Sequence, residues 1–161
     1  MPPKTRLGVM TGAIFLAAGF GSGRASAAPP DDACPLLTVA QVGATVETPV
    51  SPGAYVTPTF KKTCTWTVSN PTDSGVKFVT LMIEEPGGFD GGKRVPKVKG
   101  VEVTPASGIG DDAYFLDVGD NVGLIVKKAG VGFKVAVYGG VPVETKKAME
   151  KALAADVIAR L

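Results

Sequence analysis

The segment that comes nearest to a known chemical motif is the glycine-rich run at residues 87–94. Its sequence, Gly-Gly-Phe-Asp-Gly-Gly-Lys-Arg, has the spacing of a phosphate-binding loop: a glycine, four residues, then Gly-Lys. Arg94 stands where a serine or threonine would bind magnesium, and Pro96 interrupts the helix that should follow. These departures favour a flexible surface loop over a nucleotide site.

Carboxylates are the next candidates for chemistry. The chain has no histidine, which excludes a Ser-His-Asp or Cys-His site. Glu84 and Glu85 belong to a predicted strand, where neighbouring side chains point to opposite faces, so we expect a solvated strand end rather than a hydrolytic pair. Gly108-Ile109-Gly110 is interpreted as a turn. The other acidic candidates do not follow the spacing of a calcium loop; they are Asp111, Asp112, Asp117 and Asp120.

The chain has two cysteines, Cys34 and Cys64. In an oxidising compartment an even pair indicates a disulfide, which would contribute roughly 3 to 4 kcal/mol to the free energy of unfolding. Two free buried thiols are the alternative. A zinc site is disfavoured, because structural zinc needs four Cys or His ligands. Trp66, the single tryptophan, is expected in the core beside the disulfide.

The first 27 residues have the three parts of a secretory signal. A positive end, a mostly apolar stretch at residues 7–20 and a run of small residues follow one another. We expect cleavage between Ala27 and Ala28. The apolar stretch is shorter than the roughly 20 residues of a membrane-spanning helix, and Cys34 lies too far beyond it for lipidation. The sequence predicts export to the periplasm or the medium, with no transmembrane anchor in the mature form.

The densest basic cluster consists of Lys93, Arg94, Lys97 and Lys99. Such a cluster could contact an anionic surface, such as phospholipid head groups or a polyanionic wall polymer, although plain solvation is the alternative. The chain carries 17 basic and 15 acidic residues, and removal of residues 1–27 takes three of the basic ones. The mature chain is therefore close to neutral, so no nucleic-acid partner is predicted.

Hydrophobic periodicity predicts a single domain at residues 28–161, with an ordered core at about 34–161. Thr38 and Gln41 have the spacing of a capping box, which predicts a helix over 38–46. That helix would bury Val39, Val42 and Val46. Residues 47–59 are expected to be mostly loop, and 86–100 to be loop with a short helical turn at 89–95. Alternating apolar and polar residues predict six strands, at 63–69, 76–84, 99–104, 113–118, 122–128 and 131–138.

The last predicted element is an amphipathic helix at residues 143–161. Met149, Leu153 and Val157 recur on its apolar side. Its solvent side would carry Lys146, Lys147, Glu150 and Lys151. The predicted fold class is α+β: an antiparallel sheet of about five to six strands, with an N-terminal and a C-terminal helix packed on one face.

Three short sequences resemble those of uncharacterised exported bacterial proteins. They are Asp32-Ala33-Cys34-Pro35-Leu36-Leu37-Thr38, Cys64-Thr65-Trp66 and Gly108-Ile109-Gly110-Asp111-Asp112-Ala113-Tyr114. The same sequences are similar to small actinobacterial lipoproteins of unknown function. The resemblance implies a disulfide between Cys34 and Cys64 and an α+β sandwich, and it implies no known reaction. This chain differs from those lipoproteins in lacking a lipobox.

These observations predict a small extracytoplasmic binding or accessory domain that is not an enzyme and uses no cofactor. They specify neither a ligand nor a partner, although an envelope partner is compatible with export. Two alternatives stay open. One is an envelope-surface protein that contacts anionic lipid or polymer through its basic cluster. The other is a carboxylate-based hydrolase, which would require two acids to converge in a pocket.

Overall fold

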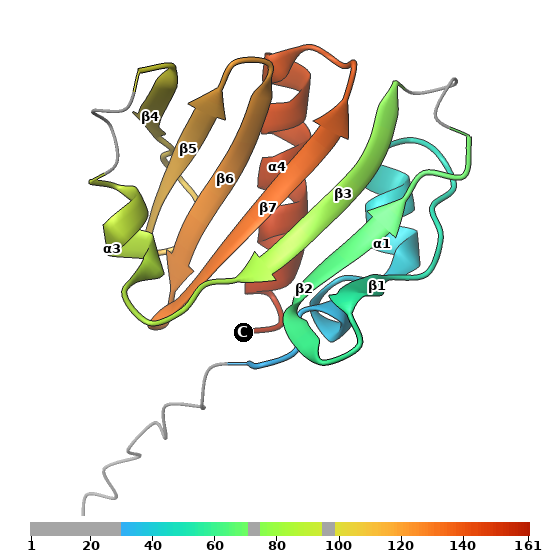
Figure 1. Ribbon diagram of the computed structural model, residues 1–161, viewed down its shortest axis with the longest axis horizontal. Helices are drawn as coiled ribbons and strands as arrows, with labels where there is room; N and C mark the ends of the chain where they lie inside the picture. Colours follow the sequence, from blue (N-terminus) through green and yellow to red (C-terminus); the bar gives the residue numbers. More distant parts are fainter. Residues whose placement is uncertain (1–29, 71–74, 95–98) are drawn as a thin grey trace, which may run out of the picture.

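The computed structural model describes residues 30–70, 75–94 and 99–161. Ala27, Ala28 and Lys97 lie outside the described residues, as does the predicted signal at 1–27. Within the described ranges the chain forms a seven-stranded sheet with helices packed against it (Figure 1). The strands are β1 (Ala54–Thr57), β2 (Phe60–Thr67), β3 (Val76–Ile83), β4 (Val101–Pro105), β5 (Asp112–Val118), β6 (Asn121–Lys128) and β7 (Val131–Gly139). The helices are η1 (Cys34–Leu36), α1 (Val39–Thr45), α3 (Gly88–Gly92) and α4 (Val143–Ile158).

The sheet is built from two meanders that meet in its centre. The strand order is β1-β2-β3-β7-β6-β5-β4, and every neighbouring pair is antiparallel. After β3 the chain passes through α3 and crosses to the opposite edge, where β4 begins. The second meander then returns to the centre, and β7 pairs with β3 from Val76 opposite Gly139 to Ile83 opposite Phe133.

The two faces of the sheet are covered differently. Phe133, Val135 and Val137 of β7 are fully buried on the face that α4 covers, and Figure 1 shows α4 lying behind β6 and β7. Helix α1 contacts α4 and contributes to the same core. This packing of the two terminal helices agrees with the predicted α+β arrangement. The short helix α3 lies on the other face, where Phe89 packs against Tyr114.

The sheet has seven strands rather than the predicted five or six. The additional strand is β1, which lies in residues 47–59, a range predicted to be mostly loop. Strand β1 has only four residues and three of them are exposed, so its sequence has no alternating pattern to detect. Its pairing with β2, which places Tyr55 opposite Cys64, forms the strand. The six predicted strands are all present with ends shifted by a few residues, and the predicted helical turn is α3.

The N-terminal helix α1 begins as its sequence predicts. The Gln41 backbone N–H donates to Thr38 Oγ1 over 3.2 Å, and the Thr38 backbone N–H donates to Gln41 Oε1 over 3.0 Å. Val42 and Val46 are fully buried, whereas Val39, the first residue of the helix, is 41% exposed and is not buried with them as predicted.

The C-terminal helix α4 ends at Ile158 and buries Leu153 and Val157 as predicted, but two charged residues are buried with them. Lys146 and Glu150 were expected in solvent, yet 1% and 0% of their surfaces are exposed. They share a stripe with the buried Leu153 and Val157, at spacings of four, seven and eleven residues from Lys146. Lys147 is half-buried and Lys151 is exposed, as expected for the helix flank. Neither α4 nor any other helix in the described ranges has the length and hydropathy that a membrane crossing requires.

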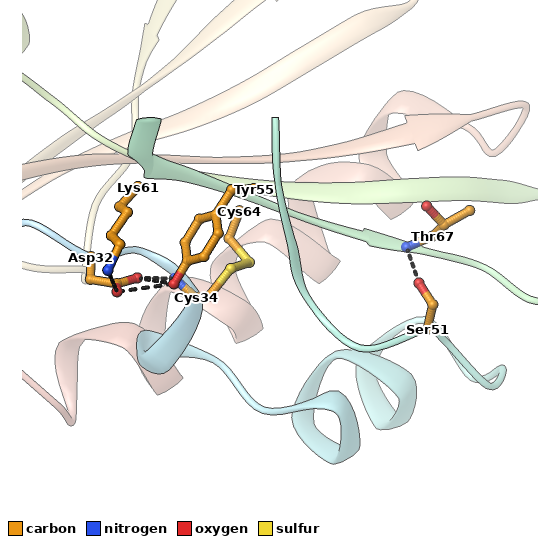
Figure 2. Close-up of a disulfide and its surroundings, with 7 residues drawn as sticks. All are labelled: Asp32, Cys34, Ser51, Tyr55, Lys61, Cys64 and Thr67. Atoms are coloured by element: carbon orange, nitrogen blue, oxygen red, sulfur yellow. Dashed lines mark hydrogen bonds and ion pairs between the residues drawn. A yellow bond between two sulfur atoms is a disulfide. The ribbon is translucent and has the colours of Figure 1, made fainter. Parts of the chain in front are cut away.

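The disulfide joins Cys34 of η1 to Cys64 of β2, as predicted, and fastens the N-terminal segment to the sheet (Figure 2). Trp66 is 1% exposed and lies in the same core. A Cβ atom on Gly53 would come within 2.7 Å of Cys64 Sγ and 2.9 Å of the Trp66 ring, so these groups lie against the Gly53 backbone. Beside the disulfide, the Tyr55 hydroxyl donates to the Asp32 carboxylate over 2.8 Å (Figure 2).

Candidate functional site: a cleft at one end of the sheet

The glycine-rich segment folds as a short helix, and two of its glycines, Gly88 and Gly92, make close contacts. A Cβ atom on Gly88 would lie 2.7 Å from Glu84 Oε2, and one on Gly92 would collide with the Tyr114 hydroxyl. Gly87, which precedes α3, has a φ of +85°, a conformation that favours glycine. The segment predicted to be a flexible loop is therefore a short helix packed on the sheet, and close contacts account for glycine at positions 88 and 92.

Tyr114 of β5 holds α3 in place. Its side chain is 2% exposed, its hydroxyl donates to the Phe89 carbonyl over 3.0 Å, and the two rings meet edge to face with centroids 5.1 Å apart. Burial raises the pKa of Tyr114 to about 12, and the negative charges of Glu84, Asp90 and Asp112 add to that rise. Tyr114 therefore stays protonated and keeps its hydrogen bond across the whole physiological range of pH.

A cleft of about 490 Å³ opens where three segments meet: the end of β3, the start of α3 and the turn between β6 and β7. Its volume lies in the range of small-molecule sites, roughly 300 to 1,000 Å³. Ile83, Phe89 and Val131 provide buried apolar side chains in its lining. Its charged lining residues are Asp31, Lys62, Glu84, Glu85, Asp90 and Lys127.

Four of those six charges are paired with one another. Lys62 Nζ lies 2.7 Å from Glu85 Oε1, and Lys127 Nζ lies 3.6 Å from Asp90 Oδ2. Lys127 Nζ also lies 5.7 Å from the centre of the Phe89 ring, a distance at which a cation is attracted to an aromatic face. The two lysines of the cleft are therefore already engaged by its own carboxylates.

Glu84 is the distinctive charged group of the cleft. Its side chain is half-buried, and burial raises the pKa of its carboxyl above the usual value, although the charge of Lys134 acts in the opposite direction. Its backbone N–H donates to the Gly132 carbonyl over 2.8 Å, which holds the chain at this position. Within the described residues, its carboxylate has no hydrogen bond and no ion pair.

The prediction of a solvated strand end holds for Glu85 but not for Glu84, which is half-buried. The two side chains have different neighbours, as predicted for a pair that points apart: Glu84 lies against Gly88 and Gly132, whereas Glu85 forms an ion pair with Lys62. Both residues line the same cleft, with Glu84 half-buried and Glu85 exposed. Neither sequence spacing nor periodicity could bring Glu84 together with Asp90 and Lys127, because these three come from different elements.

The three described residues of the basic cluster do not form one site. Lys93 forms an ion pair with Asp112, and its ammonium lies 5.3 Å from the centre of the Phe89 ring. Arg94 and Lys99 are exposed, and Lys97 lies outside the described residues. None of the three described members lines the cleft.

The aspartates that suggested calcium also have separate partners. Asp111 accepts from Lys128 Nζ over 2.8 Å and from the Ala129 backbone N–H over 2.7 Å, and these hydrogen bonds hold the pKa of Asp111 below its usual value. Asp117 pairs with Lys147 at 3.4 Å. In the described ranges, no three His, Cys, Asp or Glu side chains come together in a way that could hold a metal ion.

Beneath α4 lies a second charged cluster that the periodicity analysis missed. The Val137 backbone N–H donates to Glu150 Oε1 over 2.9 Å, while Glu150 Oε2 is buried without a hydrogen-bond partner. Burial raises the pKa of Glu150 to about 8. Lys146 Nζ donates to the Asp120 carbonyl over 2.6 Å. This cluster lies between helix and sheet, and neither Lys146 nor Glu150 lines the cleft at the end of β3.

The cleft at the end of β3 is therefore the best candidate site in the described part of the chain. Comparison of the chain with protein-family models, with curated proteins and with solved structures finds no match.

Proposed function

We propose that this chain is a small extracytoplasmic binding or accessory domain without catalytic activity, and that the cleft at the end of β3 is its ligand site. The observation that carries the proposal is the construction of that cleft. Close contacts of Gly88 and Gly92 with Glu84 and Tyr114 fix its wall, and its volume of about 490 Å³ suits a small molecule. A largely preformed site of this kind is expected to bind with little rearrangement.

Export is supported by two independent features. The first 27 residues have the pattern of a secretory signal. The disulfide between Cys34 and Cys64 is of the kind that persists in oxidising compartments and is rare in the cytosol. A function in the periplasm or the medium is therefore part of the proposal.

Carboxylate-based hydrolysis is a second candidate, and one observation favours it. Four carboxylates line the cleft, and one of them, Glu84, has a raised pKa, as a general acid would require. The lysine pairs formed by Glu85 and Asp90 weigh against it, since they leave neither carboxylate free to act as base or nucleophile. Turnover of a glycoside or ester substrate that Glu84→Gln abolishes would replace binding by hydrolysis as the function.

The proposed function is tested by filling the cleft. Asp90 lines the cleft on the exposed side of α3, so Asp90→Trp should obstruct it. The neighbouring Gly91 lies outside the lining and faces open space, so Gly91→Trp is a matched control. The protein is purified after secretion of the full chain, and a small-molecule fragment set is screened by amide chemical shifts.

We expect fragments that shift the amides of Phe89, Val131 and Gly132, and we expect Asp90→Trp but not Gly91→Trp to abolish those shifts. Fragments that bind only elsewhere, or that bind Asp90→Trp as well as the unaltered protein, would contradict the proposed function. Circular dichroism of both variants establishes that they are folded.

A further inference from the structure

The cleft has a charge imbalance that its own residues do not neutralise. Its lining contains four carboxylates but only two ammonium groups. The pairs Lys62–Glu85 and Lys127–Asp90 cancel, which leaves Glu84 and Asp31 in excess. Asp31 is exposed to solvent, whereas Glu84 is half-buried. Of these two unpaired carboxylates, Glu84 is therefore the one that water solvates less.

The surroundings of Glu84 make its lack of a partner significant. Partial burial of a carboxylate without a hydrogen-bond donor costs free energy, and this is the physical reason that its pKa rises. Lys134 attracts it from a neighbouring strand, but no ion pair forms between them within the described residues. A cation brought into the cleft would replace the water that the carboxylate has lost and would gain a charge-assisted hydrogen bond.

The apolar residues of the lining indicate what the uncharged part of the ligand should be. Ile83, Phe89 and Val131 form an apolar part of the lining. Lys93 and Lys127 already place their ammonium groups within 6 Å of the Phe89 ring centre, so Phe89 contributes apolar contact and the attraction for a cation comes from Glu84. An apolar body with one positive end matches both parts of the cleft.

We propose that the cleft takes a small organic cation, a protonated amine carried on a short apolar body, with Glu84 as its counter-ion. This assignment rests on the proposed function, because it names the class of ligand for the same cleft. Glu84 acts by charge and hydrogen bonding, and no covalent step is involved.

The test uses three probes of similar size that differ in charge: 2-phenylethylamine, 2-phenylethanol and 3-phenylpropionate. Each is titrated into the secreted protein at neutral pH, and binding is followed by the amide shifts of Phe89, Val131 and Gly132. The variant is Glu84→Gln, which keeps the shape of the side chain and removes its charge. The control is Glu102→Gln, which removes an exposed carboxylate from β4, at the opposite edge of the sheet.

We expect the amine to bind about tenfold more tightly than the alcohol, and the carboxylate to bind most weakly, because a hydrogen bond between opposite charges is stronger than one to a neutral hydroxyl. Glu84→Gln should remove the preference for the amine and leave binding of the alcohol unchanged. Glu102→Gln should leave both affinities unchanged. Added salt should weaken the binding of the amine and leave the binding of the alcohol unchanged.

The two ways of failing are distinct. If the alcohol or the carboxylate binds in the cleft as tightly as the amine, or if Glu84→Gln keeps the preference, the cationic ligand class is wrong while the cleft remains a binding site. If none of the three probes shifts the cleft amides and the fragment screen also finds no cleft ligand, the proposed function fails together with this inference.

Discussion

The Glu150 carboxylate takes the place of a strand partner for Val137. The Val137 backbone N–H donates to Glu150 Oε1 over 2.9 Å, whereas the pairing of β7 with β6 reaches only as far as Val135 opposite Leu124. Beyond that point β7 keeps its pairing with β3, where Val137 lies opposite Val79. A side chain of α4 thus completes the hydrogen bonding of the sheet, and it does so with an ionisable group in the core.

This relationship predicts that stability falls as pH rises. The pKa of Glu150 is raised from 4.5 to about 8 in the folded state, so the folded protein binds the proton more tightly than the unfolded chain does. The contribution of protonated Glu150 to the free energy of unfolding is fully present below about pH 4.5 and is lost as pH rises to about 8. Each pKa unit corresponds to roughly 1.4 kcal/mol, so the loss is on the order of a few kcal/mol.

Urea denaturation of the unaltered protein and of Glu150→Gln between pH 5 and pH 8.5 checks this prediction. The neutral variant should show a flatter dependence on pH, since it has no proton to lose. The facing charges, Lys134, Lys146 and Asp117, are present in both proteins and therefore cancel in the comparison. Parallel slopes for the two proteins would show that Glu150 does not titrate in this range.

The disulfide should contribute substantially to stability. Loss of the Cys34–Cys64 bond removes a constraint worth roughly 3 to 4 kcal/mol in the chain-entropy account. Cys34→Ala and Cys64→Ala should both lower the melting temperature, with the larger effect for Cys64→Ala, because Cys64 is fully buried and also leaves a cavity. Calorimetry with and without reductant provides the check: the unaltered protein should melt lower when reduced, and the same melting point in both conditions would contradict the prediction.

Two neighbouring glycines of α3 should respond oppositely to the same substitution. Gly92→Ala places a methyl group on the Tyr114 hydroxyl and should destabilise the protein by about 1 to 3 kcal/mol. Gly91→Ala meets open space and should be neutral or stabilising by about 0.5 to 1 kcal/mol, because alanine favours helix. Urea denaturation measures both, and Tyr114→Phe in the Gly92→Ala background should recover part of the loss. Equal effects at the two positions would mean that α3 is not held against Tyr114.

The protein should bind anionic membranes weakly. Lys93 is paired with Asp112, which leaves Arg94 and Lys99 as the exposed charges of the described part of the basic cluster. Sedimentation with phosphatidylserine vesicles at physiological salt should therefore recover little protein. Strong binding that disappears in high salt and in an Arg94→Gln, Lys99→Gln double variant would instead support an envelope-surface role.

Local pattern was enough to predict the long elements. Strands β2 and β3 alternate, α1 has its capping box at Thr38, and the two cysteines form the expected bond. Lys146 and Glu150 of α4 were predicted to face solvent because charged side chains are ordinarily exposed, yet both are buried. The spacing of these residues to Leu153 and Val157 was the signal that could have placed them inside.

The cleft could not be predicted, because it depends on the order of the strands. Glu84, Asp90 and Lys127 belong to the end of β3, to α3 and to β6, and they meet only because β7 returns to pair with β3. No periodicity within a single segment contains that information. Strand β1 was not predicted because it has only four residues and three of them are exposed, so its sequence does not alternate between apolar and polar residues.

The central ladder between β3 and β7 has a consequence for the order of events during folding. Ile83 pairs with Phe133, so the middle of the sheet cannot form until most of the chain is available. Cys34 and Cys64 both lie ahead of β3, so oxidation requires none of that later chain. A covalent bond can therefore form before the hydrogen-bonded centre, and the N-terminal segment can acquire its crosslink before the C-terminal half of the chain has folded.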